Sequence, residues 1–160
     1  MKNRASTYMQ GSVLLEVVIV LSVMTILVLG VVQLSVYNIR TSRMVLDETQ
    51  AVYLAEEGIE IVKLLRDDGW AIFADTDRGT SYYLTQGIDG WEFSSTPVST
   101  GDFSRTITIY DVERDISDDI AVSGTADEQT LRVVSSVSWS HAGSTVERSF
   151  STYITDFLTD

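Results

Sequence analysis

Acidic side chains crowd one segment in the second half of this 160-residue chain, between residues 111 and 128. Carboxylate oxygens at short spacing in a loop are ligands that Ca²⁺ accepts. The candidate calcium ligands are Asp115, Asp118, Asp119 and Asp127. A second candidate, the segment 75–79, lacks the third acid and the distal Glu of a calcium loop. The simpler interpretation is a solvated acidic loop, so we expect no metal and no cofactor, with calcium as the alternative.

The sequence gives little basis for an enzymatic active site. There is no cysteine, which excludes a thiol nucleophile, a thiolate metal site and a disulfide. The single histidine, His141, lies in an expected turn, and no G-x-S-x-G nucleophile turn or H-E-x-x-H string is present. We therefore expect His141 at the surface and no enzymatic activity. The aromatic residues Trp70, Trp91 and Trp139, with the tyrosines, are interpreted as core and sheet-face residues more readily than as a carbohydrate site.

Glu16 is the residue whose position demands an explanation. It stands directly before a stretch, residues 17–39, that contains no charged residue. A carboxylate at the edge of an apolar helix costs free energy and usually has a partner. It also lies five residues beyond Gly11, which closes a short polar segment that carries Lys2 and Arg4 but no acid.

The uncharged stretch is long enough to cross a bilayer, at roughly 35 Å as a helix. Basic residues precede it, so the N-terminus is expected in the cytoplasm and the remainder outside. A cleaved signal peptide ending near residues 28–30 is one alternative, but the apolar run continues beyond that point. A plain signal anchor is another alternative, and it leaves Glu16 unexplained.

The string from Gly11 to Glu16, GSVLLE, resembles the cleavage motif of type IV pilin and type II secretion pseudopilin precursors. In that family a short basic leader ends in Gly, and Glu is the fifth residue of the mature chain. The resemblance implies cleavage between Gly11 and Ser12 by a prepilin peptidase and N-methylation of Ser12. The family prefers Phe at the first mature position, where this chain has Ser12. Glu16 is the implied assembly residue.

The same resemblance implies partners and a location. Other pilin subunits, a membrane assembly platform and, before assembly, the lipid bilayer would contact the chain. The protein would be a single-pass membrane protein with an extracytoplasmic head, and an extracellular filament component after assembly. The sequence from Gln50 to Lys63 and the strand patterns of the head look most similar to minor pilins of the pilus-modification type.

Beyond residue 39 the pattern changes from uniformly apolar to amphipathic. Apolar residues recur with the 3.6-residue period of a helix that has one buried face, as far as Leu65. Gly69 is expected to end this helix in a left-handed conformation. One helix from Ser12 to about Asp68 is therefore predicted, half of it apolar and half amphipathic.

The remainder has strand character. Segments 81–84 and 91–94 flank a turn at 87–90 and predict a hairpin. Segment 103–113 alternates, with Phe103, Arg105, Ile107 and Ile109 on one face and Thr106, Thr108, Tyr110 and Val112 on the other. Segment 130–140 has Leu131, Val133, Val137 and Trp139 on one face, and segment 145–157 has Val146, Phe150 and Ile154 inward. A turn at 141–144 joins the last two strands, which predicts an antiparallel meander covered by the helix.

The predicted fold is α+β and pilin-like, with four parts: a leader (1–11), a transmembrane and filament-core helix (12–39), an amphipathic stalk helix packed on the head (40–68) and a β-rich head (69–160). The expected function is that of a filament subunit, and more specifically a minor subunit. The alternative is a membrane-anchored surface binding module that does not polymerise. A net charge of −12 makes nucleic acid an unfavourable partner and argues against a DNA-uptake receptor.

Overall fold

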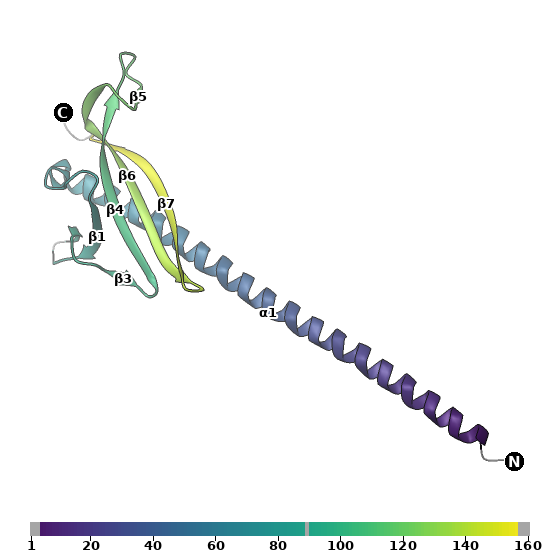
Figure 1. Ribbon diagram of the computed structural model, residues 1–160. Helices are drawn as coiled ribbons and strands as arrows, with labels where there is room; N and C mark the ends of the chain where they lie inside the picture. Colours follow the sequence, from purple (N-terminus) through teal and green to yellow (C-terminus); the bar gives the residue numbers. More distant parts are fainter. Residues whose placement is uncertain (1–3, 89, 157–160) are drawn as a thin grey trace. The chain divides into compact units, whose positions relative to one another are not determined.

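The computed structural model describes residues 4–88 and 90–156, and side chains from Ser12 onward. Its first element is a continuous helix, α1 (Arg4–Asp68), which confirms the long helix expected from the hydrophobic pattern (Figure 1). The chain forms two compact units, Met1–Val45 and Leu46–Asp160. Helix α1 contributes residues to both units.

Gly69 ends α1, as expected, but with a different conformation. Its N–H lies 3.2 Å from the Leu65 carbonyl oxygen and 3.1 Å from that of Arg66, which closes the last turn. Its φ of 155° and ψ of 133° lie outside the left-handed helical region that we expected and in a region open to glycine. A short 3₁₀ helix, η1 (Trp70–Phe73), follows and inserts Phe73 into the core.

Seven strands form an antiparallel sheet in the second unit, in which the main path is β2-β1-β4-β6-β7 (Figure 1). The strands are β1 (Ser81–Gln86), β2 (Trp91–Ser94), β3 (Ser99–Thr100), β4 (Phe103–Arg114), β5 (Ile120–Ala121), β6 (Thr125–His141) and β7 (Ser144–Thr155). The hairpin β1–β2 and the meander β4-β6-β7 are the ones the alternation predicts, which confirms the α+β fold. The short strands β3 and β5 both pair with β4 and were not predicted.

The core lies between the sheet and the second half of α1. One cluster joins Val62 and Leu65 of α1 to Phe73, Ile107 and Ile109, among other residues. A second cluster joins the small side chains of Ala51 and Ala55 to the larger residues Phe103, Val137 and Trp139. The predicted inward set of β6 is confirmed, because all four of its members are buried. The three tryptophans pack in or against these clusters, as expected.

Two predicted side-chain positions need correction. Val112 was expected on the face opposite Ile109, yet it is buried. The pairing of β4 with β6 shifts between Asp111 and Val112, where three extra residues of β6 bulge out, and this shift interrupts the simple alternation. Phe150 lies on the predicted face, opposite Ser135, but is 37% exposed. It belongs to β7, an edge strand, whereas α1 approaches the sheet over β4 and β6.

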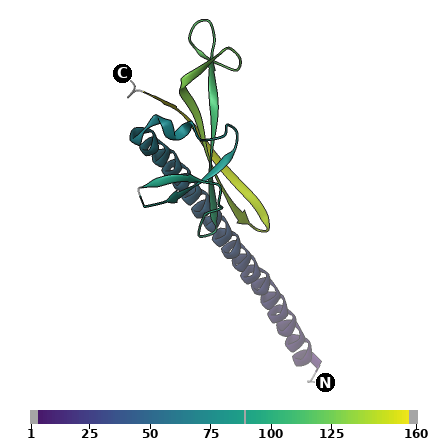
Figure 2. The same cartoon turned by 90° about the vertical axis from the view of Figure 1, so that its left-hand side faces the viewer.

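Strand β6 begins five residues before the predicted start, and its first residues pair with the end of β4. Together with β5 these residues form an arm, residues 112–127, that extends from the end of the sheet (Figure 2). Three positions named in the sequence predictions lie outside the described residues: Lys2 of the leader, Asp89 of the first turn and Phe157 at the expected end of the last strand.

Candidate functional site

Gly11 and Ser12 both lie within α1, so the predicted cleavage site is on a helical segment. Glu16 follows one turn later and is exposed. Among the residues with described side chains, 12–88 and 90–156, Glu16 has no hydrogen bond or ion pair. Among those described residues the capacity of the Glu16 carboxylate to accept hydrogen bonds is therefore unused.

Apolar side chains surround this part of α1 on every side. From Ser12 to Ile39 all residues are exposed, and Glu16 is the only charged one among them. Ser22, Thr25 and Ser35 direct their hydroxyl groups to the carbonyl oxygens four residues earlier, at 2.7, 2.8 and 3.0 Å. The helix thereby satisfies these three hydroxyl groups itself and presents a largely apolar surface. This helix is long and apolar enough to cross a membrane.

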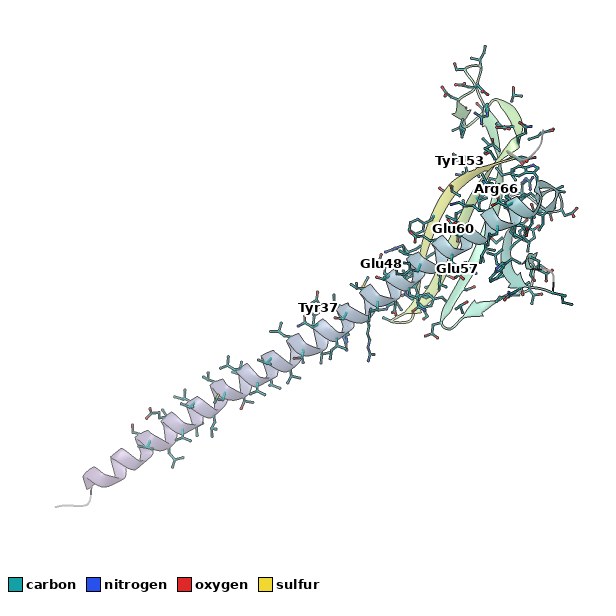
Figure 3. The ribbon with its side chains drawn as sticks, turned by 180° about the vertical axis from the view of Figure 1, so that it is seen from behind. Tyr37, Glu48, Glu57, Glu60, Arg66 and Tyr153 are labelled. Carbon is teal, nitrogen blue, oxygen red and sulfur yellow. The ribbon has the colours of Figure 1, made fainter. Side chains whose placement is uncertain are left out.

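The second half of α1 is bound to the sheet by charged side chains on both flanks of its buried stripe. Arg105 of β4 donates to Glu57 at 2.9 Å and to the Leu54 carbonyl oxygen at 3.0 Å. On the other flank, Arg148 of β7 donates to Glu48 at 2.6 Å, and Figure 3 labels both glutamates on α1. Arg105 had been predicted on the core face of β4, and these contacts explain how a charged residue is tolerated there.

His141 takes part in the same attachment. It is the last residue of β6, rather than a turn residue, and its side chain is partly buried. Its Nδ1 atom lies 3.7 Å from a carboxylate oxygen of Asp47 on α1. The expected surface histidine is thus a contact between the end of the hairpin and the helix.

One flank of α1 in the second unit has its own apolar hollow. It is lined by Leu46, Thr49, Gln50, Tyr53, Leu54 and Glu57. Leu46 and Tyr53 are well exposed. The predicted amphipathic pattern therefore leaves some exposed apolar surface beside the stripe that packs on the sheet.

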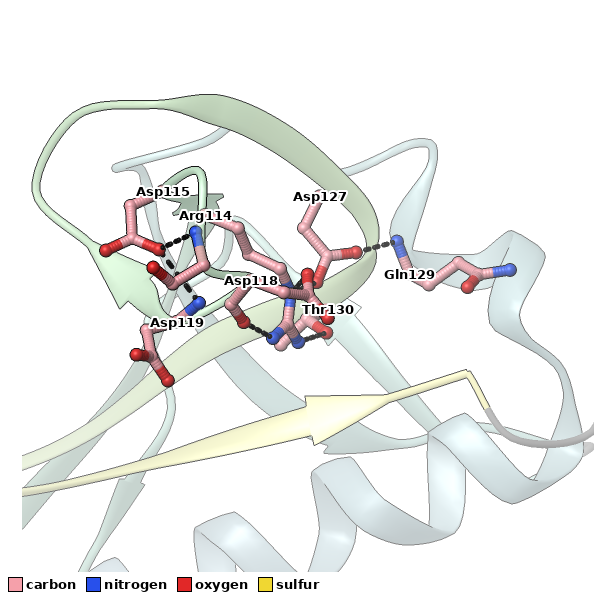
Figure 4. A network of polar contacts seen from close by, with 8 residues as sticks. Arg114, Asp115, Asp118, Asp119, Asp127, Gln129 and Thr130 are labelled. Carbon is pink, nitrogen blue, oxygen red and sulfur yellow. Dashed lines mark hydrogen bonds and ion pairs between the residues drawn. The ribbon is translucent and has the colours of Figure 1, made fainter.

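The candidate calcium ligands lie in the arm, and most of them already bind groups of the protein (Figure 4). Arg114 donates to Asp127 at 2.6 Å and to the Asp118 carbonyl oxygen at 2.8 Å. The hydrogen bond from Arg114 lowers the pKa of the Asp127 carboxyl, and the same bond raises the pKa of Arg114. Asp115 accepts the backbone N–H groups of Ser117 and Asp119, at 2.8 and 3.1 Å.

These contacts fold the acidic loop by internal hydrogen bonds. Within the parts of the chain that the structure describes, no three acidic or histidine side chains gather as a metal site would require. The carboxylates of Asp115, Asp118 and Asp127 act there as caps and ion-pair partners, while Asp119 contributes its backbone N–H and carbonyl groups. The expectation that no metal binds here, with calcium as the alternative, stays untested.

One cluster of polar and aromatic residues was not predicted from the sequence. Tyr110 of β4, Arg132 of β6 and Tyr153 of β7 are paired across three adjacent strands. Alternation places them on the face opposite Leu131, Val133 and Ile154, and thus away from the core. The sequence does place each of these residues at an outward position of a predicted strand. It does not give the register of the three strands, which brings the residues together.

The tyrosines and Arg132 line a hollow of about 460 Å³ together with Asp111, Glu113 and residues of β5. The guanidinium of Arg132 lies over the Tyr110 ring, at 4.7 Å from its centre. Comparison of the chain with protein-family models, curated proteins and solved structures found no match.

Proposed function

We propose that the chain is a structural subunit of a type IV pilus-like or type II secretion pseudopilus filament. The observation that carries this proposal is the first part of α1. From Ser12 to Ile39 it exposes apolar side chains on all sides, with Glu16 as its only charge. Burying one large apolar side chain is worth about 1.5–3 kcal/mol, so a surface of this size requires lipid or other helices around it.

A filament subunit needs both environments in turn. The helix would first lie in the bilayer with the head outside the cytoplasm, and would then pack against the helices of other subunits. An assembly platform in the membrane would make the exchange. A prepilin peptidase would cut between Gly11 and Ser12 and methylate the new Ser12 amine, as the resemblance of GSVLLE to the family motif implies.

Glu16 would set the position of one subunit along its neighbour. An ionised group at mid-bilayer costs about 2.5–3.5 kcal/mol, and less near the interface. The carboxylate of Glu16 and the amine of Ser12 in a neighbouring subunit would neutralise each other once both are surrounded by apolar helices. Apolar helices alone can slide along one another, whereas one charge pair fixes their register.

A minor subunit, which primes or modifies assembly, suits the head better than the bulk subunit does. The chain carries 23 acidic against 11 basic residues. A filament built mainly of such subunits would bring many like charges close together. The similarity of the second half of the helix to minor pilins favours the same assignment.

The test replaces the carboxylate in the native host. Glu16→Ala is expected to be cleaved to a Ser12 terminus, to stay in the membrane and to be depleted from the sheared filament fraction. Glu56→Ala is the matched control, because Glu56 is an exposed glutamate on the same helix. N-terminal sequencing of both fractions gives the readout. Normal incorporation of Glu16→Ala would remove the intersubunit role.

The alternative function is a membrane-anchored surface module that does not polymerise. Such a protein would keep its leader, so a mature protein that still begins at Met1 would overturn the filament proposal. In that case the hollow beside Arg132 would be the first place to look for its activity.

A further inference from the structure

Arg132 differs from the other basic residues of the second unit. Six of them lie within 4 Å of a carboxylate group: Lys63, Arg66, Arg78, Arg105, Arg114 and Arg148. Arg132 has no carboxylate partner among residues 12–88 and 90–156, in a chain with a net charge of −12. Its only described side-chain contact is the Tyr110 ring, which holds the guanidinium in place and leaves its N–H groups available.

Two acidic residues contribute to the lining of the same hollow, and both of their carboxylates are held by other partners. Asp111 accepts a hydrogen bond of 2.7 Å from Arg78, and Glu113 accepts the Gly124 N–H at 2.7 Å. Each carboxylate binds about four hydrogen-bond donors when fully used. Asp111 pairs with Leu131, whose side chain lies in the core, so alternation directs the Asp111 carboxylate away from Arg132 and Tyr153. Glu113 is fixed in position and still has capacity to accept hydrogen bonds from hydroxyl groups.

The arm forms an apolar wall of the hollow through Ile120, Ala121 and Val122. Its backbone is tightly constrained at Gly124, where an added Cβ would lie 2.0 Å from the Arg114 carbonyl oxygen. The ion pair of Arg114 with Asp127 holds the base of the same arm. Across the hollow, Tyr153 is 49% exposed and offers an aromatic surface (Figure 3).

We propose that this hollow binds an acidic sugar of the hexuronic acid class. The sugar carboxylate would pair with the fork of Arg132, a hydroxyl group would donate to Glu113, and its apolar C–H face would lie on Tyr153. A volume of about 460 Å³ suits one or two sugar rings. This site is independent of filament assembly and would operate in an anchored module as well.

An acidic peptide satisfies the hollow less well. It would bring a carboxylate to Arg132, but it has no ring whose C–H face lies on Tyr153 while a neighbouring hydroxyl group donates to Glu113. Several negative charges would also meet the acidic head, whereas a single uronate carries one. The combination of one unpaired arginine, the acceptor Glu113 and an aromatic ring therefore selects a polyhydroxylated monoanion.

The experiment measures binding to the full chain in a zwitterionic detergent that contains no sugar. Glucuronate is the probe, and glucose is the matched ligand that lacks the carboxylate. Saturation-transfer NMR with titration is expected to show glucuronate bound at least about tenfold more tightly than glucose, because a charge-assisted pair is lost. Acetate at equal concentration should compete poorly, since it lacks the ring and its hydroxyl groups.

Variants locate the site. Arg132→Gln should abolish the preference for glucuronate over glucose, and Tyr153→Ala should weaken both ligands. Arg148→Gln is the control, because Arg148 is an arginine of the neighbouring strand that binds Glu48 instead. Equal binding of glucuronate and glucose to the unaltered protein would overturn the proposal, and so would unchanged binding in Arg132→Gln. Competition by acetate equal to that by glucuronate would also overturn it, and so would tighter binding of a blocked Glu-Val dipeptide.

Discussion

The two halves of α1 have the same backbone and opposite relations to the rest of the chain. In the segment 12–45 every side chain is exposed, whereas in the segment 46–68 the stripe from Ala51 to Leu65 is buried against the sheet. Both halves are rich in apolar residues. The apolar stripe of the second half packs against the sheet of the same chain. The apolar side chains of the first half are not buried by any described residue of their own compact unit.

The difference lies in the size and placement of side chains. Ala51, Ala55 and Gly58 let α1 approach the sheet closely, so the larger residues of β4 and β6 fill the space between them. The first half carries bulky branched residues around its whole circumference and offers no narrow face. Such a helix fits a surrounding that is apolar in all directions, which a single small sheet cannot provide.

Leu65→Ala is expected to have the largest effect on the folded second unit. Leu65 is buried among residues of η1 and the sheet, so truncation leaves a cavity and should lower the free energy of unfolding by about 2–5 kcal/mol. Leu29→Ala removes the same atoms from the exposed half and should leave the unfolding of the head unchanged. Thermal unfolding of the full chain in detergent, followed by near-ultraviolet circular dichroism of the tryptophans, measures both. Equal losses would show that the two halves are not distinct.

Gly58→Leu tests the close approach itself. A Cβ at Gly58 would lie 2.6 Å from the Ser135 hydroxyl oxygen and 2.9 Å from Cδ of Arg105. Because both the helix and β6 would have to shift, we expect a loss of about 1–3 kcal/mol, reduced in part by the better helix propensity of Leu. Gly30→Leu, where nothing lies within 4 Å, should be neutral in the same assay. A neutral Gly58→Leu would mean that α1 is not tightly seated on the sheet.

Low pH should destabilise the head and leave the apolar half of α1 unaffected. The folded-state pKa of Asp127 is lowered by its hydrogen bond with Arg114, below an ordinary value of 3.8. Its contribution to stability is therefore present above that value and is lost as the pH falls through the lowered folded pKa. Asp127→Asn should remove this acid dependence and cost about 1 kcal/mol near neutral pH. Unfolding midpoints between pH 2 and 7 test this, while far-ultraviolet dichroism should report the apolar half of α1 as unchanged.

The smallest expected effect is an increase in the free energy of unfolding. The hairpin turn between β6 and β7 places Ala142 at φ 51° and Gly143 at φ 82°. Both positions of such a turn favour residues that tolerate positive φ, and Ala does so less readily than Asn. Ala142→Asn should raise the free energy of unfolding by about 0.5–1 kcal/mol, visible as a higher unfolding temperature. A lower unfolding temperature would contradict the assignment of strain to this turn.

Local patterns predicted much of this molecule. The 3.6-residue period and the glycine at position 69 predicted the end of α1, although the helix begins at Arg4 and not at the expected Ser12. The period-2 alternation predicted β1, β2, β4, β6 and β7. The buried set on β6 was correct because this strand is central and four of its inward residues are large and apolar, although the small residue Ser135 is buried among them. Val112 was misplaced because the bulge depends on how β6 pairs with β4, which no local pattern records.

The sequence by itself determined that the chain begins with an apolar helix, that Glu16 is the lone charge in it and that an alternating β-rich head follows. Periodicity and charge patterns involve residues that are close in the sequence, so they can be recognised without knowledge of the fold. Only the tertiary structure decided that Arg114 binds Asp127 and that Tyr110, Arg132 and Tyr153 align across three strands. Residues far apart in the chain come together there, and strand register, which sequence alternation alone does not specify, decides which of them meet.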